Sequence, residues 1–208
     1  RLSRGLGDVY KRQIYSTPGH KKYYVVSDVL ENFVSKAGQH IEILKLEEFG
    51  PALFIDSELQ VAEKDEKKYS GQFVGSALNL SKNNSSAAII GGGDGGVARE
   101  LSSKGFNLID WYELDPEVVK VCQKHLLKVC GDIKANNKVK TYWGDAFESI
   151  KKVKDSKYDK IFVDLNDDQF CIDLAAKNMK GLKRILKPGG IITAQVGCMS
   201  KKPRQVKN

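Results

Sequence analysis

The sequence is poor in the residues from which metal sites and disulfide frameworks are built, with 4 Cys and 3 His among 208 residues. The cysteines Cys122, Cys130, Cys171 and Cys198 form no Cys-x-x-Cys pair, and no histidine stands at ligand spacing from them. This pattern excludes the common zinc motifs and gives no sign of a disulfide framework. We therefore expect reduced, buried thiols and no bound metal.

Long apolar runs are also missing. None approaches the roughly 20 residues that a membrane-spanning helix needs, and no secretory signal opens the chain. With 41% hydrophobic and 29% charged residues, the composition is typical of a globular protein. We expect a soluble cytoplasmic protein with one good core, room for a small appended domain and no membrane partner.

The body of the chain has little excess charge of either sign. Of the total charge of +8, the first 13 residues carry +3 and the last eight carry +4, so only +1 is left between them. A nucleic-acid groove would need cations clustered in the folded body. The mixed run at residues 63–68 is instead typical of a solvated surface. We expect no nucleic-acid partner.

The first 13 residues stand apart from the rest. Residues 8–13 read DVYKRQ, which is what the mosaic end of a common sequencing transposon encodes when it is translated in frame. We expect residues 1–13 to be a library scar. On that reading the natural sequence begins near Ile14 and is a fragment.

Residues 14–65 predict a small antiparallel β domain. Short β-rich runs lie at 23–26, 41–44, 52–55 and 59–61, separated by Gly, Pro, Asp and Ser. A helix is expected at 66–80.

From residue 87 onward, strand and helix patterns alternate, which defines a second domain at 66–208. Strands are expected at 87–90, 108–113, 139–142, 160–164 and 191–195, and helices at 97–104, 116–129, 146–153 and 172–186. Five such units predict an α/β fold with a Rossmann-like, doubly wound and mostly parallel sheet.

A glycine-rich loop follows the first of these strands and opens a helix. It contains Gly91, Gly92, Gly93 and Gly95, with Asp94 among them. Glycines let a ligand approach the backbone beside the positive end of a helix. Glu113 ends the next strand, 22 residues after Gly91, where an acidic residue holds ribose hydroxyls. The pattern predicts a nucleoside ligand.

Asp94 narrows the choice of ligand. A carboxylate in the loop repels phosphates, which disfavours NAD, FAD and nucleoside triphosphates. S-adenosylmethionine has no phosphate, and its decarboxylated form ends in an ammonium that Asp94 would attract while rejecting the carboxylated form. The alternative reading is that Asp94 only caps the following helix.

Several motifs together resemble the spermidine/spermine synthase family of aminopropyltransferases. They are residues 91–96, 112–115, 144–145 and the strand ending at Asp164, with 49–56 and 62–69 upstream. The likeness covers about residues 38–200. It implies a fold like that of class I methyltransferases, decarboxylated S-adenosylmethionine as co-substrate without a prosthetic group, a polyamine as second substrate, and a homodimer at full length.

The resemblance also implies roles for individual residues. On the donor side it assigns the nucleoside to Gln39 and the glycine loop, the ammonium to Asp94, the ribose to Glu113 with Asp115 beside it, and the adenine side to Asp145. Beside the attacking amine it places Tyr69 and the catalytic Asp164. Read without the resemblance, Asp145 is a helix cap and Tyr69 a packing aromatic.

The chemistry suits these residues. A sulfonium is a good leaving group, but an amine with a pKa of roughly 10 must lose a proton before it attacks. Asp164 with Tyr69 is expected to accept that proton. The acidic run at 164–168 is not expected to bind calcium, because Gln169 stands where an EF-hand loop needs glycine.

The acceptor is less sharply defined. Leu165 after Asp164, Ser70 after Tyr69 and residues 128–133 resemble spermine synthases, which favours spermidine as acceptor. Asp167 keeps the second acidic position that holds the far amine of putrescine in spermidine synthases, so putrescine stands next.

Two rival functions remain at this point: an S-adenosylmethionine methyltransferase and a non-catalytic family member. The family continues with antiparallel strands after the fifth parallel strand. We therefore expect the C-terminal strands to be missing and an unpaired sheet edge to be exposed.

Overall fold

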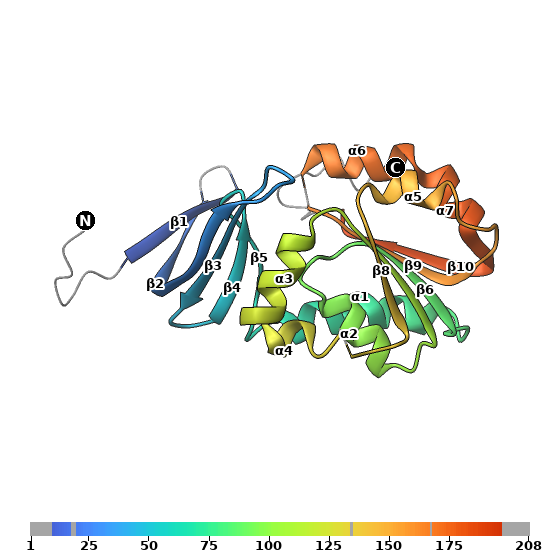
Figure 1. The fold of residues 1–208 in the computed structure, drawn as a ribbon, viewed down its shortest axis with the longest axis horizontal. Coiled ribbons are helices and arrows are strands. Elements are labelled where there is room, and N and C mark those ends of the chain that lie inside the picture. Colours follow the sequence, from blue (N-terminus) through green and yellow to red (C-terminus); the bar gives the residue numbers. More distant parts are fainter. Residues whose placement is uncertain (1–9, 18–19, 134, 167, 197–208) are drawn as a thin grey trace.

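The computed structural model describes residues 10–17, 20–133, 135–166 and 168–196 (Figure 1). Within these residues the strands form two five-stranded sheets. One belongs to a small β domain and the other to an α/β domain. Across the same residues, no helix is long and apolar enough to span a membrane.

The β domain is an antiparallel meander. Its strands are β1 (Tyr10–Thr17), β2 (His20–Val34), β3 (His40–Leu46), β4 (Gly50–Ile55) and β5 (Glu58–Ala62), paired in that order. The β4–β5 hairpin turns through Asp56 and Ser57, whose φ angles are 50° and 68°. Positive φ at both central residues suits a two-residue hairpin turn, because its twist matches that of the strands.

The strand β2 is much longer than the run predicted at residues 23–26. Its pairing with β3 shifts register between Val26 and Asp28 and again between Val29 and Glu31. Such bulges place two residues opposite one and interrupt the alternation of buried and exposed side chains. The two-residue period that marks a strand in the sequence is therefore lost after Val26. Residues 10–17 pair with β2, and the origin of residues 1–13 as a library scar stays a prediction.

The α/β domain contains a parallel sheet with the order β10-β9-β6-β7-β8. Its strands are β6 (Ser86–Gly91), β7 (Leu108–Glu113), β8 (Val139–Trp143), β9 (Tyr158–Asp164) and β10 (Leu186–Ala194). Its helices are α1 (Glu66–Leu80), α2 (Gly96–Ser103), α3 (Pro116–His125), α4 (Leu127–Cys130), α5 (Ala146–Ile150), α6 (Gln169–Lys177) and α7 (Met179–Ile185). The predicted fold class, a doubly wound sheet behind a small antiparallel domain, is confirmed.

Both faces of this sheet are covered. In Figure 1, α1 and α2 lie below the sheet and α5, α6 and α7 above it. Along β6, Ala87 and Ile89 pack in the core with α1 and α2, while Ala88 and Ile90 pack in the core with α5 and α7. All four are fully buried. A strand buried on both faces has a continuous apolar sequence, and this run is what predicts β6.

Several helical boundaries differ from the prediction, and the helix expected at 146–153 ends at Ile150. The helix expected at 116–129 ends at His125, and α4 follows after Leu126, whose φ and ψ of −122° and 41° are not helical. The helix expected at 172–186 starts earlier, at Gln169, and divides at Asn178 into α6 and α7. The strand expected at 191–195 begins earlier, at Leu186, and residues 187–190 bulge out of β10 between its paired residues Leu186 and Ile191.

The two domains share a core. Ile41, Ile43 and Leu53 of the β domain pack with Val118 and Leu126 of the helical layer. The backbone N–H of Lys36 donates to Glu117 Oε2 at 2.7 Å. This packing holds the β domain against α3, beside the carboxyl ends of the parallel strands (Figure 1).

Candidate active site

The site lies where the order of the parallel strands reverses. The chain proceeds from β6 through β7 to β8 on one side, and then returns to β9 on the other side of β6. Ligands bind at such a switch point, in the crevice outside the carboxyl ends of the strands. A cavity of about 580 Å³ opens there, between the glycine loop and the β domain. That volume is within the range of small-molecule sites.

The glycine loop is fitted tightly against the end of β9. Gly91 has φ 81°, and a Cβ at this position would lie 2.4 Å from the carbonyl oxygen of Asp164. The next amide, Gly92 N–H, donates to that same oxygen at 2.8 Å. Glycine is therefore required at Gly91 for both its backbone conformation and the close approach of β9. This contact places the loop beside the Asp164 carboxylate.

Asp94 caps a helix and also lines the cavity, so the capping role does not exclude a contact with a ligand. Its Oδ1 accepts a hydrogen bond from Gly96 N–H at 2.6 Å, at the first residue of α2. The residue also lines the cavity, as do Gly91, Gly92 and Gly93. Gly95 is not among the lining residues, and a Cβ there would meet Ile133 and Cys130 at 2.6 and 2.9 Å. The helix amide fixes Asp94 while its carboxylate remains at the cavity.

Tyr69 and Asp164 meet across the cavity from opposite parts of the chain. The Tyr69 hydroxyl donates to Asp164 Oδ1 at 2.7 Å. Tyr69 comes from α1 and stacks on Phe73 with ring centroids 5.7 Å apart, and its side chain remains 40% exposed. Tyr69 is therefore more than a packing aromatic, because its hydroxyl is directed at the carboxylate that ends β9.

Of the other residues predicted on the donor side, some line the cavity and one does not. Glu113 is 7% exposed and lines the cavity, as do Gln39 and Asp145. Asp145 also caps α5, since its Oδ1 accepts from Phe147 N–H at 2.7 Å.

Asp115 does not line the cavity. Its side chain is buried and caps α3 by accepting from Glu117 N–H at 2.9 Å, while its own N–H donates to Glu113 Oε1 at 2.9 Å. Asp167 lies outside the described residues.

Three carboxylates at the cavity are harder to ionise than usual. Burial, followed by repulsion from Asp164, raises the pKa of Asp94 to about 7. Burial likewise raises the pKa of Asp164 to about 6, against the opposing hydrogen bond from Tyr69, and the pKa of Glu113 to about 7. Groups of one charge gathered in a poorly solvated site favour ligands of the opposite charge. When ionised, these three carboxylates give the cavity a negative charge.

Sequence reasoning missed part of the cavity wall and one buried charge. Tyr24, Glu58, Leu59 and Gln60 line the cavity from the β domain, and no motif marked them. Glu66, expected to belong to a solvated run, is 2% exposed and ion-paired with Arg99. The other charged residues of that run are at least partly exposed.

The described residues contain no group of three or more His, Cys, Asp or Glu side chains placed to hold a metal. Cys122 and Cys130 are buried and free, and Cys171 is half-buried. Cys198 lies outside the described residues.

The fold and the site define a class: α/β proteins with a glycine loop at the switch point of the sheet, an acidic residue at the end of the next strand and, among the described residues that line the cavity, no Lys or Arg. Residues 66–208 match the family model described as the spermine/spermidine synthase domain. The chain therefore belongs to the spermine/spermidine synthase family.

Individual relatives agree with the family model. The chain is 35% identical over 173 residues to a polyamine aminopropyltransferase of Prochlorococcus marinus strain MIT 9312, covering 82% of this chain and 60% of that protein. It is 34% identical over 180 residues to the same enzyme of strain MIT 9215, covering 84% and 62%. The chain thus spans about three fifths of the length of these curated relatives.

Solved structures share the fold. Spermidine synthase from Thermotoga maritima superimposes with a TM-score of 0.86 at 22% identity, covering 98% of this chain and 70% of that one. A spermidine synthase in complex with the transition-state analogue AdoDATO gives a TM-score of 0.85 at 21% identity, with the same coverage.

Proposed function

We propose that this site transfers the aminopropyl group of decarboxylated S-adenosylmethionine to a primary amine of a polyamine, releasing methylthioadenosine. The observation that carries the proposal is the meeting of Asp94 and Asp164 at one cavity, with their ionisation opposed by burial and mutual repulsion. Two cationic substrates relieve that repulsion, whereas a phosphate would add to it.

The donor occupies the glycine-loop half of the cavity in this proposal. Glu113 holds the ribose hydroxyls, and Asp145 lies on the adenine side beside Phe147. The donor ammonium lies at Asp94, in the position that the carboxylate of ordinary S-adenosylmethionine would otherwise share. One residue thus attracts the decarboxylated donor and disfavours the carboxylated one.

The transfer itself is a single displacement. The acceptor nitrogen attacks the methylene next to sulfur, the new N–C bond forms as the C–S bond breaks, and the electron pair of that bond leaves with the sulfur. The acceptor ammonium first gives a proton to Asp164, which Tyr69 orients through its 2.7 Å hydrogen bond. Holding the amine and the methylene in line supplies much of the remaining acceleration.

Within this function we favour spermidine as acceptor and putrescine next. The support is the sequence pattern: Leu165 follows Asp164 and lines the cavity, and Ser70 follows Tyr69. Ser70 is 1% exposed and faces Gly96 rather than the cavity, so its effect on an acceptor would be indirect. A homodimer at full length is part of the same proposal.

The test is a product analysis with both acceptors in competition. The protein is incubated with decarboxylated S-adenosylmethionine, spermidine and isotope-labelled putrescine, so that newly formed spermidine differs in mass from the spermidine added. We expect methylthioadenosine with spermine exceeding spermidine as the new polyamine. In a parallel sample with S-adenosylmethionine, methylated polyamine and no aminopropyl product from either donor would refute the proposal in favour of a methyltransferase.

A further inference from the structure

A buried ion pair lies directly behind the donor loop. Glu66 begins α1, one turn before Tyr69, and its side chain is 1% exposed. Its two carboxylate oxygens accept from Arg99 Nη1 at 2.6 Å and from Nη2 at 2.9 Å. This fork-on-fork arrangement is the strong form of an ion pair, and it fixes both side chains.

Arg99 connects three helices around the loop. It belongs to α2, and its Nη1 also donates to Val129 O at 2.5 Å and to Lys128 O at 3.1 Å, both in α4. Through Glu66 the same guanidinium holds the first turn of α1. The helix that carries Tyr69 is therefore tied to the helix that follows Asp94.

Glu66 also faces Asp94 across Gly96. A Cβ built on Gly96 would lie 2.6 Å from Glu66 Oε1, 2.7 Å from Ser70 Oγ and 2.9 Å from Asp94 Oδ1. The two carboxylate oxygens therefore lie no further apart than the sum of their distances to that point. Only glycine fits there. Without a Cβ between them, Glu66 and Asp94 interact at short range.

Charged and titratable groups from six elements surround Asp94 and its neighbour Glu66. They are Asp164 from β9, Glu113 from β7, Glu66 from α1, Arg99 from α2, and the thiols of Cys122 and Cys130 from α3 and α4. Among the described residues, Arg99 is the cation paired directly with a carboxylate of this set. Its loss would leave Glu66 as a buried anion beside Asp94.

We propose that Arg99 is a positioning residue for the aminopropyl transfer, which neutralises Glu66 and thereby sets the charge that Asp94 presents to the donor. The same pair holds α1 so that the Tyr69 hydroxyl reaches Asp164. The benefit of this arrangement to catalysis rests on the proposed function. The effect of the Glu66–Arg99 pair on Asp94 is a property of the unliganded protein.

Two single variants change the net charge of the Glu66–Arg99 pair beside Asp94 in opposite directions. Glu66→Gln leaves the Arg99 charge uncompensated and should lower the pKa of Asp94, whereas Arg99→Met leaves Glu66 uncompensated and should raise it. At an effective dielectric constant near 20, a unit charge at about 5 Å supports a shift of about one pH unit after partial compensation. The double variant restores the original balance of charge.

The experiment measures the pKa of Asp94 in the unliganded protein by carboxyl-carbon NMR, with the Asp94 signal assigned through Asp94→Asn. Decarboxylated S-adenosylmethionine is then titrated into each variant across the same pH range. We expect the pKa to fall by about one unit in Glu66→Gln, to rise in Arg99→Met, and to return to within a few tenths of the original in the double variant. The midpoint of donor affinity against pH should follow.

Arg184→Met is the matched control. Arg184 also donates to backbone carbonyls, Val153 O at 2.7 Å, Ile150 O at 2.8 Å and Lys151 O at 3.4 Å, and pairs with Asp155. Its loss should lower stability without moving the pKa of Asp94.

An unchanged or raised Asp94 pKa in Glu66→Gln would overturn the inference and leave Arg99 with a structural role alone. If Arg99→Met does not fold, Glu66→Gln and the double variant still decide the matter. Failure of the original protein to bind the donor at any pH would refute the proposed function instead, while the NMR titration would still test the ion pair.

Discussion

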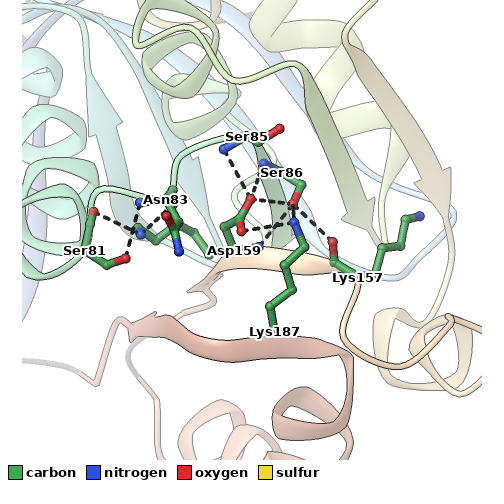
Figure 2. A network of polar contacts seen from close by, with 8 residues as sticks. Ser81, Asn83, Ser85, Ser86, Lys157, Asp159 and Lys187 are labelled. Carbon is green, nitrogen blue, oxygen red and sulfur yellow. Dashed lines mark hydrogen bonds and ion pairs between the residues drawn. The ribbon is translucent and has the colours of Figure 1, made fainter.

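Two aspartates on β9, Asp159 and Asp164, stand at opposite ends of the same strand and meet opposite surroundings. At the amino end, Asp159 accepts from Lys187 Nζ at 3.0 Å, Ser86 Oγ at 2.8 Å and Ser86 N–H at 2.9 Å (Figure 2). At the carboxyl end, Asp164 accepts from the neutral Tyr69 and faces Asp94.

The two surroundings shift the pKa of the same residue type in opposite directions. Burial alone raises the pKa of Asp159, but the hydrogen bonds from Lys187 and Ser86 outweigh it and lower the pKa below its ordinary value. At Asp164, burial outweighs the single hydrogen bond from Tyr69, and the pKa rises to about 6. The carboxylate at the amino end of the strand has a cation and several donors as partners, whereas the one at the carboxyl end accepts from Tyr69 and lines the cavity.

Lys160, next to Asp159 at the amino end, is also a buried charged residue with hydrogen-bond partners in the protein. Its side chain is fully buried, and its Nζ donates to Asn83 O at 2.9 Å and Ser81 O at 3.3 Å, in the loop after α1. Buried polar groups with partners stabilise a fold, whereas unmet charges in a site cost stability and serve binding. We therefore expect substitutions at the carboxyl end of β9 to change turnover and substitutions at the amino end to change stability.

The largest expected effect is on turnover. Asp164→Asn removes the proton acceptor but keeps the shape, so turnover should fall by about 10³-fold or more, while donor affinity changes only a few-fold. Initial rates and calorimetric donor binding measure the two quantities separately. Asp159→Asn is the control and should keep its turnover. Wild-type turnover in Asp164→Asn would remove Asp164 from the mechanism.

The next effect is on stability, and here we expect the larger loss at Asp159 rather than at Asp164. Asp159→Asn should lower the free energy of unfolding by about 2–3 kcal/mol, because Lys187 and the Ser86 N–H lose a charged acceptor in a buried place. Asp164→Asn should leave stability unchanged or raise it, since it relieves repulsion with Asp94. Urea denaturation compares the two variants, and equal losses would contradict the distinction between the ends.

A smaller effect concerns pH. The folded-state pKa of Asp94, about 7, lies above its unfolded value, so the folded state binds this proton more tightly. Its contribution to stability is therefore present at low pH and is lost as pH rises through about 7. Between pH 8 and pH 6 the unliganded protein should gain about 3 °C in melting temperature from this residue. Asp159, with its lowered pKa, should lose its contribution only as pH falls below the ordinary carboxyl range.

Thermal melts of the original protein and of Asp94→Asn at both pH values isolate the Asp94 contribution. The gain on acidification should be smaller in Asp94→Asn than in the original protein. Equal gains in the two proteins would assign the effect to other groups.

Much of this molecule could be predicted from local sequence. The apolar run of β6, the ends of α1 at residues 66 and 80, and the glycine loop all follow from short-range patterns. The strand β2 could not be predicted in full, because its bulges break the alternation that identifies a strand. The division between α6 and α7 at Asn178 had no Gly or Pro to mark it.

The site was predicted where a motif carries it and missed where only packing does. Glu113 and Asp164 end their strands and Asp94 lies in the loop after β6, so the topology of a parallel sheet brings the three together. Glu66 lies in a charged run whose neighbours are mostly exposed, and its burial depends on Arg99, 33 residues away. Glu58 and Gln60 reach the cavity only because the β domain packs on α3. Contacts of this kind leave no local signal.

The most direct test of the central claim is the ratio of affinities for decarboxylated and ordinary S-adenosylmethionine, measured by calorimetry at pH 7.5 in the original protein and in Asp94→Asn. If the Asp94 carboxylate in the glycine loop selects an ammonium, the original protein should prefer the decarboxylated donor by about 100-fold. In Asp94→Asn the ratio should fall toward one. Equal or tighter binding of ordinary S-adenosylmethionine by the original protein would contradict the account.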